Sequence, residues 1–154
     1  MKQPNRRELL LAALGAAAVA PARAAPPLLP APSSLAAEAA DAQGRGRALV
    51  VMFSLPGCPW CKLVRESYLV PLRAEGQPVV EVDTTGAGAL AGFDGAPTTG
   101  QQLSARLGIR VTPTVLFVGR GGRELAPRLP GVPLPDFYGA YLQERVDAAN
   151  RAAG

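Results

Sequence analysis

Residues 48–69 have the sequence ALVVMFSLPGCPWCKLVRESYL, and this stretch decides the fold. Its first six residues, 48–53, are apolar without interruption, which predicts a short buried strand. Residues 62–69 carry apolar side chains at helical spacing, which predicts an amphipathic helix. Between them lie Cys58 and Cys61, the only two cysteines among 154 residues. The pair is therefore expected where a strand turns into a helix.

This placement predicts different chemistry for the two sulfurs. Cys58 stands at the helix N-terminus, where free backbone N–H groups and the helix dipole favour a thiolate over a thiol. Cys61 follows three residues later on the same face, one turn deeper. We therefore expect one sulfur to attack and the other to resolve.

Two other interpretations of the cysteine pair remain open at this stage. A structural disulfide between Cys58 and Cys61 would close a four-residue ring, which stabilises by only about 2 kcal/mol against about 4.7 for a 100-residue loop. A metal site would need two further ligands, from carboxylates or from a second copy of the chain, because the sequence has no histidine and no other cysteine. Redox exchange is the leading hypothesis, and no bound metal is expected.

The absence of histidine excludes several further classes of functional site. It excludes Ser–His and Cys–His catalysis, as well as metal and haem sites held by histidine. Lys62 follows the second cysteine, so the motif is not a haem-attachment sequence.

Residues 1–24 have the pattern of a signal peptide. Basic residues Lys2, Arg6 and Arg7 precede the apolar run 9–20, which is too short to span a bilayer, and cleavage is expected after Ala24. The paired arginines fit a twin-arginine signal and an ordinary secretory signal equally well. Either way we expect an exported, periplasmic protein of one domain, without stable membrane insertion after cleavage.

Removing this leader changes the charge balance. The leader carries four basic residues and one acidic residue, so the formal net charge of +4 falls by 3 to +1. The remaining basic residues are scattered, and no nucleic-acid partner is expected.

The remaining chain predicts a compact α/β domain over residues 34–151, preceded by a proline-rich lead-in, 25–33, that should be extended and mobile. The predicted helices cover 35–43, the segment from the cysteines to about Pro71, 101–107 and 135–151, and the predicted strands cover 48–53, 78–83, 109–118 and 124–129. The last helix is expected to turn Phe137, Tyr141, Leu142 and Val146 to one face. Residues 84–100 form a long loop in which a short helical turn is expected. The result is a mixed four-stranded sheet flanked by helices on both faces.

Over residues 34–151 the chain resembles the thioredoxin-like superfamily. The resemblance rests on the element order, on the Cys-x-x-Cys that opens the helix after the buried strand, and on Val111-Thr112-Pro113-Thr114 at the start of a later strand. The resemblance implies that Cys58 attacks a client disulfide, that Cys61 resolves the mixed disulfide, and that the 58–61 disulfide is the only redox group. It also implies a cis bond before Pro113, with Thr112 and Gly131 beside it on the client-docking surface.

Pro59 and Trp60, between the cysteines, complete the motif. Pro59 suits the first helical position, where a missing N–H is harmless. The resemblance implies an exposed Trp60 for client contact, although a lone tryptophan is often buried. The alternative to a cis bond before Pro113 is an ordinary trans peptide bond.

The sequence also departs from thioredoxin itself. Met52 and Val79 stand where an acid and a lysine are usual, and Glu81 is the only substitute proton acceptor suggested by the sequence. The resemblance still implies a thiol:disulfide oxidoreductase of the reductase or isomerase type, expected to act as a monomer on client proteins with an unidentified electron donor or acceptor. The alternatives are a non-enzymatic binding module with a static disulfide, and copper(I) delivery by the dithiol.

Overall fold

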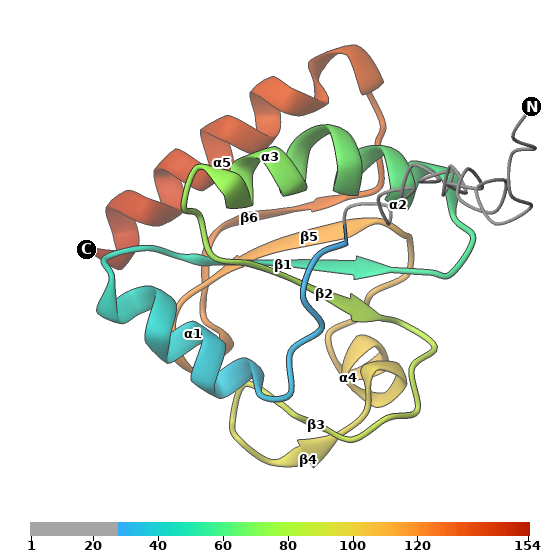
Figure 1. The fold of residues 1–154 in the computed structure, drawn as a ribbon, viewed down its shortest axis with the longest axis vertical. Helices are drawn as coiled ribbons and strands as arrows, with labels where there is room; N and C mark the ends of the chain where they lie inside the picture. Colours follow the sequence, from blue (N-terminus) through green and yellow to red (C-terminus); the bar gives the residue numbers. More distant parts are fainter. Residues whose placement is uncertain (1–27) are drawn as a thin grey trace, which may run out of the picture.

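The computed structural model describes residues 28–154 and has a four-stranded sheet at its centre (Figure 1). The strand order is β2-β1-β5-β6. The four strands are β1 (Leu49–Ser54), β2 (Val79–Asp83), β5 (Thr114–Val118) and β6 (Glu124–Pro130). β1 pairs in parallel with β2 and antiparallel with β5, and β5 pairs antiparallel with β6. The predicted mixed α/β sheet is confirmed.

Helices cover both faces of this sheet. On one face lie α2 (Pro59–Val64), the π-helical segment η1 (Arg65–Leu69), α3 (Val70–Ala74) and α5 (Tyr138–Ala153), and on the other lie α1 (Leu35–Gly44) and α4 (Gly100–Arg106) (Figure 1). Because side chains alternate along a strand, Val50 and Met52 face the first layer, while Val51 and Phe53 face the second. β1 is buried at all six positions, which explains its uninterrupted apolar sequence.

The helix that begins after Cys58 is longer than the sequence predicts. It passes through Pro71 and ends at Ala74, whereas an end near Pro71 was expected. In the π-helical turn before the proline, the Val70 N–H reaches back to the Arg65 carbonyl. Pro71 therefore falls in the first turn of α3, where a residue without an N–H is tolerated.

Two further expectations for the middle of the chain are wrong. Residues 84–99 contain a small hairpin, β3 (Leu90–Ala91) with β4 (Pro97–Thr98), in place of a helical turn. The strand expected from residue 109 begins only at Thr114, because residues 109–113 form a loop that ends in a cis proline. The hairpin turn at 119–123 includes the short 3-10 segment η2 (Arg120–Gly122).

The last helix has a different buried face from the one predicted. It is preceded by the 3-10 turn η3 (Pro135–Phe137), and α5 starts at Tyr138. Leu142 and Val146 are buried as expected, but Phe137 and Tyr141 are exposed. Tyr138 takes the inward position, because it lies four residues before Leu142 and so falls on the same face of the α-helix.

The expected signal peptide, residues 1–24, lies outside the described residues, as does the lead-in up to residue 27. Residues 28–33, expected to be mobile, lie against the sheet edge. Leu29 is buried, the Glu81 N–H donates to the Pro30 carbonyl at 3.0 Å, and the Ala91 N–H donates to the Ser33 carbonyl at 3.0 Å. This part of the lead-in thus belongs to the folded domain.

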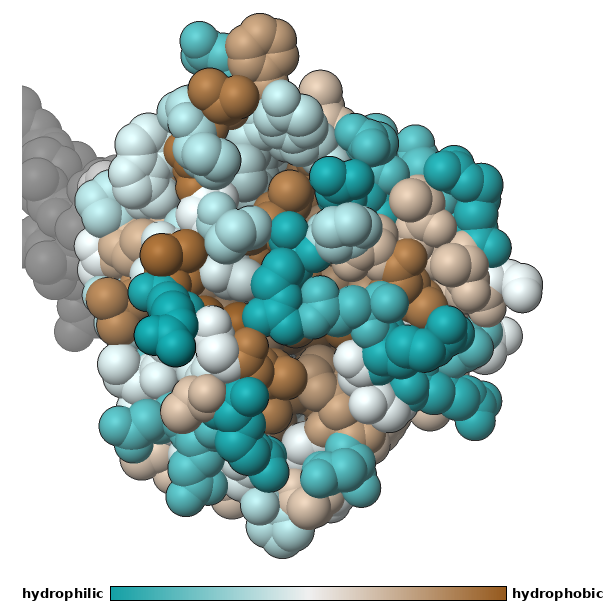
Figure 2. Space-filling view, turned by 180° about the vertical axis from the view of Figure 1, so that it is seen from behind, coloured by the Kyte–Doolittle hydropathy of each residue, from teal (hydrophilic) through white to brown (hydrophobic). Residues whose placement is uncertain are grey.

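The surface of the domain mixes polar and apolar residues. Figure 2, which looks from behind, shows hydrophilic and apolar side chains interspersed over that face. Within residues 28–154, no helix combines the length and apolarity needed to cross a membrane.

Candidate active site

Cys58 is the N-cap of the helix that runs from Pro59 to Ala74. Its backbone is extended (φ −73°, ψ 116°), and its sulfur accepts a hydrogen bond from the Cys61 N–H at 3.2 Å. Pro59 occupies the first turn, so the missing proline N–H leaves no donor unsatisfied. The local sequence therefore aims a free backbone donor at the first sulfur.

The surroundings of Cys58 favour its thiolate. Partial burial acts to raise the pKa of Cys58, but hydrogen bonds from Cys61, Thr112 and the Trp60 backbone outweigh it and lower the pKa from its ordinary value. The Thr112 hydroxyl donates to the sulfur at 3.9 Å, and the Thr112 carbonyl accepts from the thiol at 3.8 Å. Hydrogen-bond donors therefore stabilise the Cys58 thiolate, while the side chain remains partly exposed to solvent.

Cys61 has the opposite character. It is buried, and this burial raises its pKa to about 11, with the hydrogen bond to the Cys58 side chain adding to the effect. Both cysteines are free thiols in this structure. The two sulfurs therefore differ in both access and ionisation.

The loop opposite the cysteines brings together the other predicted residues. The Thr112–Pro113 peptide bond is cis, and the Gly131 N–H donates to the Pro113 carbonyl at 2.7 Å. Gly131 has a φ of +67°, a conformation that favours glycine. Trp60, between the two cysteines, is 48% exposed. Thr112 thus touches Cys58, while Pro113 and Gly131 form the adjoining loop surface.

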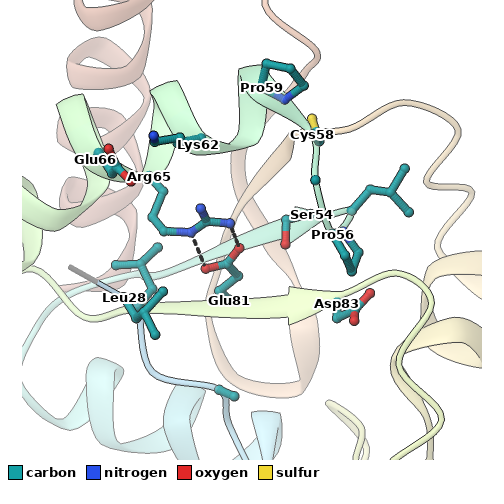
Figure 3. Close-up of a pocket in the computed structure, with 14 residues that line it drawn as sticks. Leu28, Ser54, Pro56, Cys58, Pro59, Lys62, Arg65, Glu66, Glu81 and Asp83 are labelled. Atoms are coloured by element: carbon teal, nitrogen blue, oxygen red, sulfur yellow. Dashed lines mark hydrogen bonds and ion pairs between the residues drawn. The ribbon is translucent and has the colours of Figure 1, made fainter. Parts of the chain in front are cut away.

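A cavity of about 710 Å³ opens on another side of Cys58 (Figure 3). It lies between the helix, the β1–α2 loop, β2 and the lead-in; its lining includes Leu28, Leu55, Cys58, Lys62, Arg65 and Glu81. Cys58 therefore borders this hollow as well as the cis-proline loop.

An ion pair forms part of the cavity wall. Arg65 donates two hydrogen bonds to the Glu81 carboxylate, at 2.8 and 2.5 Å, and the two side chains are only 17% and 14% exposed (Figure 3). The bond to Glu81 raises the pKa of Arg65 against the effect of burial. Glu81 pairs in register with Met52, so an acid does lie beside the position where the sequence lacks one. It is held by the guanidinium and is not a free carboxylate.

Sequence reasoning did not identify Arg65 as a residue that lines the same cavity as Cys58. Arg65 follows Cys61 by four residues, and this i, i+4 spacing is a signal that points to it. Among the described residues, no three His, Cys, Asp or Glu side chains are grouped as a metal site requires.

Comparison with known proteins agrees with this geometry. Residues 35–145 match the family described as the thioredoxin-like domain. The chain belongs to the thioredoxin-like family. No curated protein matches it significantly.

Solved structures also resemble this chain. A thioredoxin-fold protein from Helicobacter pylori is 15% identical, with a TM-score of 0.53, and the match covers 76% of this chain and 82% of that one. The periplasmic thioredoxin SoxS from Paracoccus pantotrophus, in its reduced form, is 23% identical with a TM-score of 0.41, covering 66% of this chain and 98% of that one. At 15% identity the likeness to the Helicobacter pylori protein concerns the fold alone. The thioredoxin-like fold with Cys58 and Cys61 close together supports a thiol–disulfide oxidoreductase role in general terms.

Proposed function

We propose that this thioredoxin-like protein exchanges disulfides with client proteins through Cys58 and Cys61. The observation that carries the proposal is the asymmetry of the pair: Cys58 is accessible and its pKa is lowered, whereas Cys61 is buried and its pKa is raised to about 11. A nucleophilic thiolate must be reached by its substrate, while a resolving thiol needs to reach only its neighbour.

In the reducing direction, the reaction takes two exchange steps. The Cys58 thiolate attacks one sulfur of a client disulfide, and the other client sulfur leaves as a thiolate that takes a proton from water. Cys61 then loses its proton to water and attacks the Cys58 sulfur, which breaks the mixed disulfide. The client leaves as a dithiol, and its two electrons come from the pair, which is left as the 58–61 disulfide. An external dithiol donor restores the reduced form, and the reverse sequence oxidises a client.

The client is proposed to dock on the surface formed by Thr112, Pro113 and Gly131. Support comes from the contact of Thr112 with the Cys58 sulfur and from the hydrogen bond between Gly131 and Pro113. Trp60, half exposed between the two cysteines, offers apolar area to a client side chain. No additional bound cofactor and no second copy of the chain is part of the proposal.

Export to the periplasm belongs to the same proposal. It is supported by the basic and apolar segments within residues 1–24. Fractionation of cells that express the full chain, with mass measurement of the N-terminus, tests it: a periplasmic product starting at residue 25 is expected, and an uncleaved cytoplasmic product would contradict it.

Insulin-disulfide reduction tests the chemistry. Cys58→Ser is expected to abolish turnover, because no accessible thiolate remains. Cys61→Ala is expected to accumulate a mixed disulfide with the client, because nothing resolves it. Turnover by Cys58→Ser at the wild-type rate would overturn the proposal.

The direction of electron flow is proposed to be that of a reductase or isomerase. Equilibration of the 58–61 disulfide with a glutathione buffer measures the potential that decides this. A strongly oxidising potential would assign the protein to client oxidation, and a very negative potential without turnover would favour a binding module with a static disulfide.

A further inference from the structure

The cavity beside Cys58 has no part in the exchange chemistry proposed above. Its volume of about 710 Å³ lies in the range typical of ligand sites. Apolar residues form much of its wall, and they include Leu28, Leu55, Pro56 and Pro59. Leu28 and Leu55 are 70% and 41% exposed, so their apolar surface is open to a ligand.

One side of the cavity is formed by the carboxyl ends of two parallel strands. Ser54 and Asp83 are the last residues of β1 and β2, and they are paired in register. Because side chains alternate along a strand, Ser54 points to the same face of the sheet as Met52. Asp83 likewise points to the same face as Val79, and Met52 and Val79 belong to one core cluster. Ser54 and Asp83 therefore line the same cavity side by side (Figure 3).

The Ser54 hydroxyl is a polar group in need of a partner. Ser54 is only 5% exposed, and its carbonyl accepts a hydrogen bond from the Thr84 hydroxyl. Its own hydroxyl makes no hydrogen bond to any residue in the described range 28–154, and Figure 3 shows it directed from β1 toward β2. Because buried hydroxyls are normally paired, this one is free to bind a polar group that enters the cavity.

The charges that line the cavity leave one carboxylate without a counter-ion. The lining holds two cationic side chains and three carboxylates: Lys62, Arg65, Glu66, Glu81 and Asp83. Arg65 pairs with Glu81. Lys62 and Glu66 are neighbours one turn apart on the same helix, so their opposite charges offset each other. Asp83 forms no ion pair with the residues that the structure describes, so a cation is the complementary ligand.

We propose that the cavity binds a lysine or arginine side chain of the client, close in sequence to the client cysteine that Cys58 attacks. The methylene stem packs against Leu28 and Leu55, and the cationic end donates hydrogen bonds to Asp83 and Ser54. This inference rests on the proposed function and names the class of client that the site prefers.

Cys58 connects the cavity with the proposed docking surface. It lines the cavity, and its sulfur contacts Thr112 on the cis-proline loop. A client cysteine bonded to Cys58 therefore has its neighbouring residues beside the cavity. A client carboxylate in the same place would be repelled by Asp83.

Single-turnover reduction of disulfide-linked peptide dimers by the reduced protein tests the inference. Each peptide carries one cysteine, and a lysine is placed in turn at the two positions before it and the two after it. Peptides with norleucine or glutamate in place of the lysine are the comparison. At one position we expect the lysine peptide to react about tenfold faster than the norleucine peptide, as a hydrogen bond to a charged group predicts. The glutamate peptide should be the slowest.

A positive charge beside a cysteine also speeds exchange by itself, because it makes the client sulfur a better leaving group. The same peptides are therefore reduced with mercaptoethanol, and the lysine-to-norleucine ratio of rates found there is divided out. Asp83→Asn removes the charge and keeps an oxygen that can accept from the Thr85 N–H. It should bring the ratio close to the mercaptoethanol value, and Ser54→Ala should lower the ratio in part.

Asp94→Asn is the matched control. Asp94 is exposed and lies outside the cavity lining, and it accepts from the Ala96 N–H at 3.0 Å, much as Asp83 accepts from the Thr85 N–H at 2.8 Å. The two changes therefore remove one carboxylate each from similar turns. Asp94→Asn should keep the wild-type ratio.

Equal corrected rates for lysine and norleucine peptides at every position, or a preference for glutamate, would overturn the inference and leave the proposed function intact. These comparisons use the wild type and do not depend on the folding of a variant. A lysine preference retained in full by Asp83→Asn or Ser54→Ala would also contradict the site. Failure of every peptide to react with Cys58 would instead overturn the proposed function.

Discussion

At the scale of single residues, hydrogen bonds and burial give two chemically identical side chains different ionisation. Cys58 gains donors from the helix N-terminus and from Thr112, whereas Cys61 is buried, so the pKa values of the two thiols move in opposite directions. The donors at the helix N-terminus could be predicted from the sequence, because they lie within three residues of Cys58 along the chain. The contribution of Thr112 could not be derived from local pattern, because 54 residues separate it from Cys58.

Thr112→Val tests this long-range donor. The change removes the hydroxyl and keeps the shape, so the pKa of Cys58 should rise by about 0.5–1 unit, as expected for the loss of one weak hydrogen bond to the thiolate. Alkylation of Cys58 as a function of pH measures it.

Thr112→Ser is the matched control, because it retains a hydroxyl at the same position. It should keep the wild-type midpoint. Equal shifts in Thr112→Val and Thr112→Ser would show that the hydroxyl is not the cause.

At the scale of elements, local sequence signals account for two helix starts but not for the end of the helix after Cys58. Ser34 and Thr99 cap α1 and α4 through their side-chain oxygens, as their residue types indicate. The helix after Cys58 passes Pro71 because a π-helical turn precedes it, and no local signal in the sequence announces that turn. The β3–β4 hairpin was also missed, because strands of two residues are too short to show alternation.

The packing of α4 against β2 yields a prediction of stability. A methyl group at Gly100 would lie 2.1 Å from the Asp83 carbonyl oxygen, a backbone atom that cannot move aside alone. Gly100→Ala should therefore lower the free energy of unfolding by about 1–3 kcal/mol or more. Urea unfolding measures the change.

Gly44→Ala is the matched control at the end of α1, where a methyl group would meet nothing within 4 Å. Its stability should stay unchanged or rise by up to about 1 kcal/mol, because alanine favours the helix. Equal stability of Gly100→Ala and Gly44→Ala would refute the close approach of α4 to β2.

At the scale of the whole molecule, the strand order was within reach of sequence reasoning. A strand–helix–strand unit gives the parallel pair β1 and β2, and a tight turn at 119–123 gives the antiparallel pair β5 and β6. The cavity beside Cys58 could not be predicted from the sequence. Its walls come from the lead-in, two strands and a helix, and these side chains meet only after folding. The ion pair of Arg65 with Glu81 was missed for the same reason, since its partners are 16 residues apart.

The buried thiol predicts how the stability of the reduced protein changes with pH. Between about pH 8.5, where a cysteine of the unfolded chain ionises, and about 11, the folded protein retains the Cys61 proton that the unfolded chain has lost. Stability should therefore fall as pH rises through this window, by at most about 1.4 kcal/mol per unit. Cys58 acts in the other direction: its lowered pKa stabilises the fold above the unfolded value, and this contribution is lost as pH falls through the folded pKa.

Denaturant unfolding under reducing conditions checks this, with Cys61→Ser as the control. The control lacks the buried thiol and should lose less stability over the same pH range. Parallel stability curves for the two proteins would show that Cys61 is not held in its neutral form.

The most direct measurement of the central claim is the rate of iodoacetamide modification at each cysteine of the reduced protein, followed by peptide mass spectrometry across pH. An accessible thiolate at the helix head, with a protonated neighbour behind it, predicts that Cys58 reacts with a midpoint below that of a free cysteine, while Cys61 stays unmodified until pH approaches about 11. A shared midpoint for the two thiols, or faster modification of Cys61, would contradict the account.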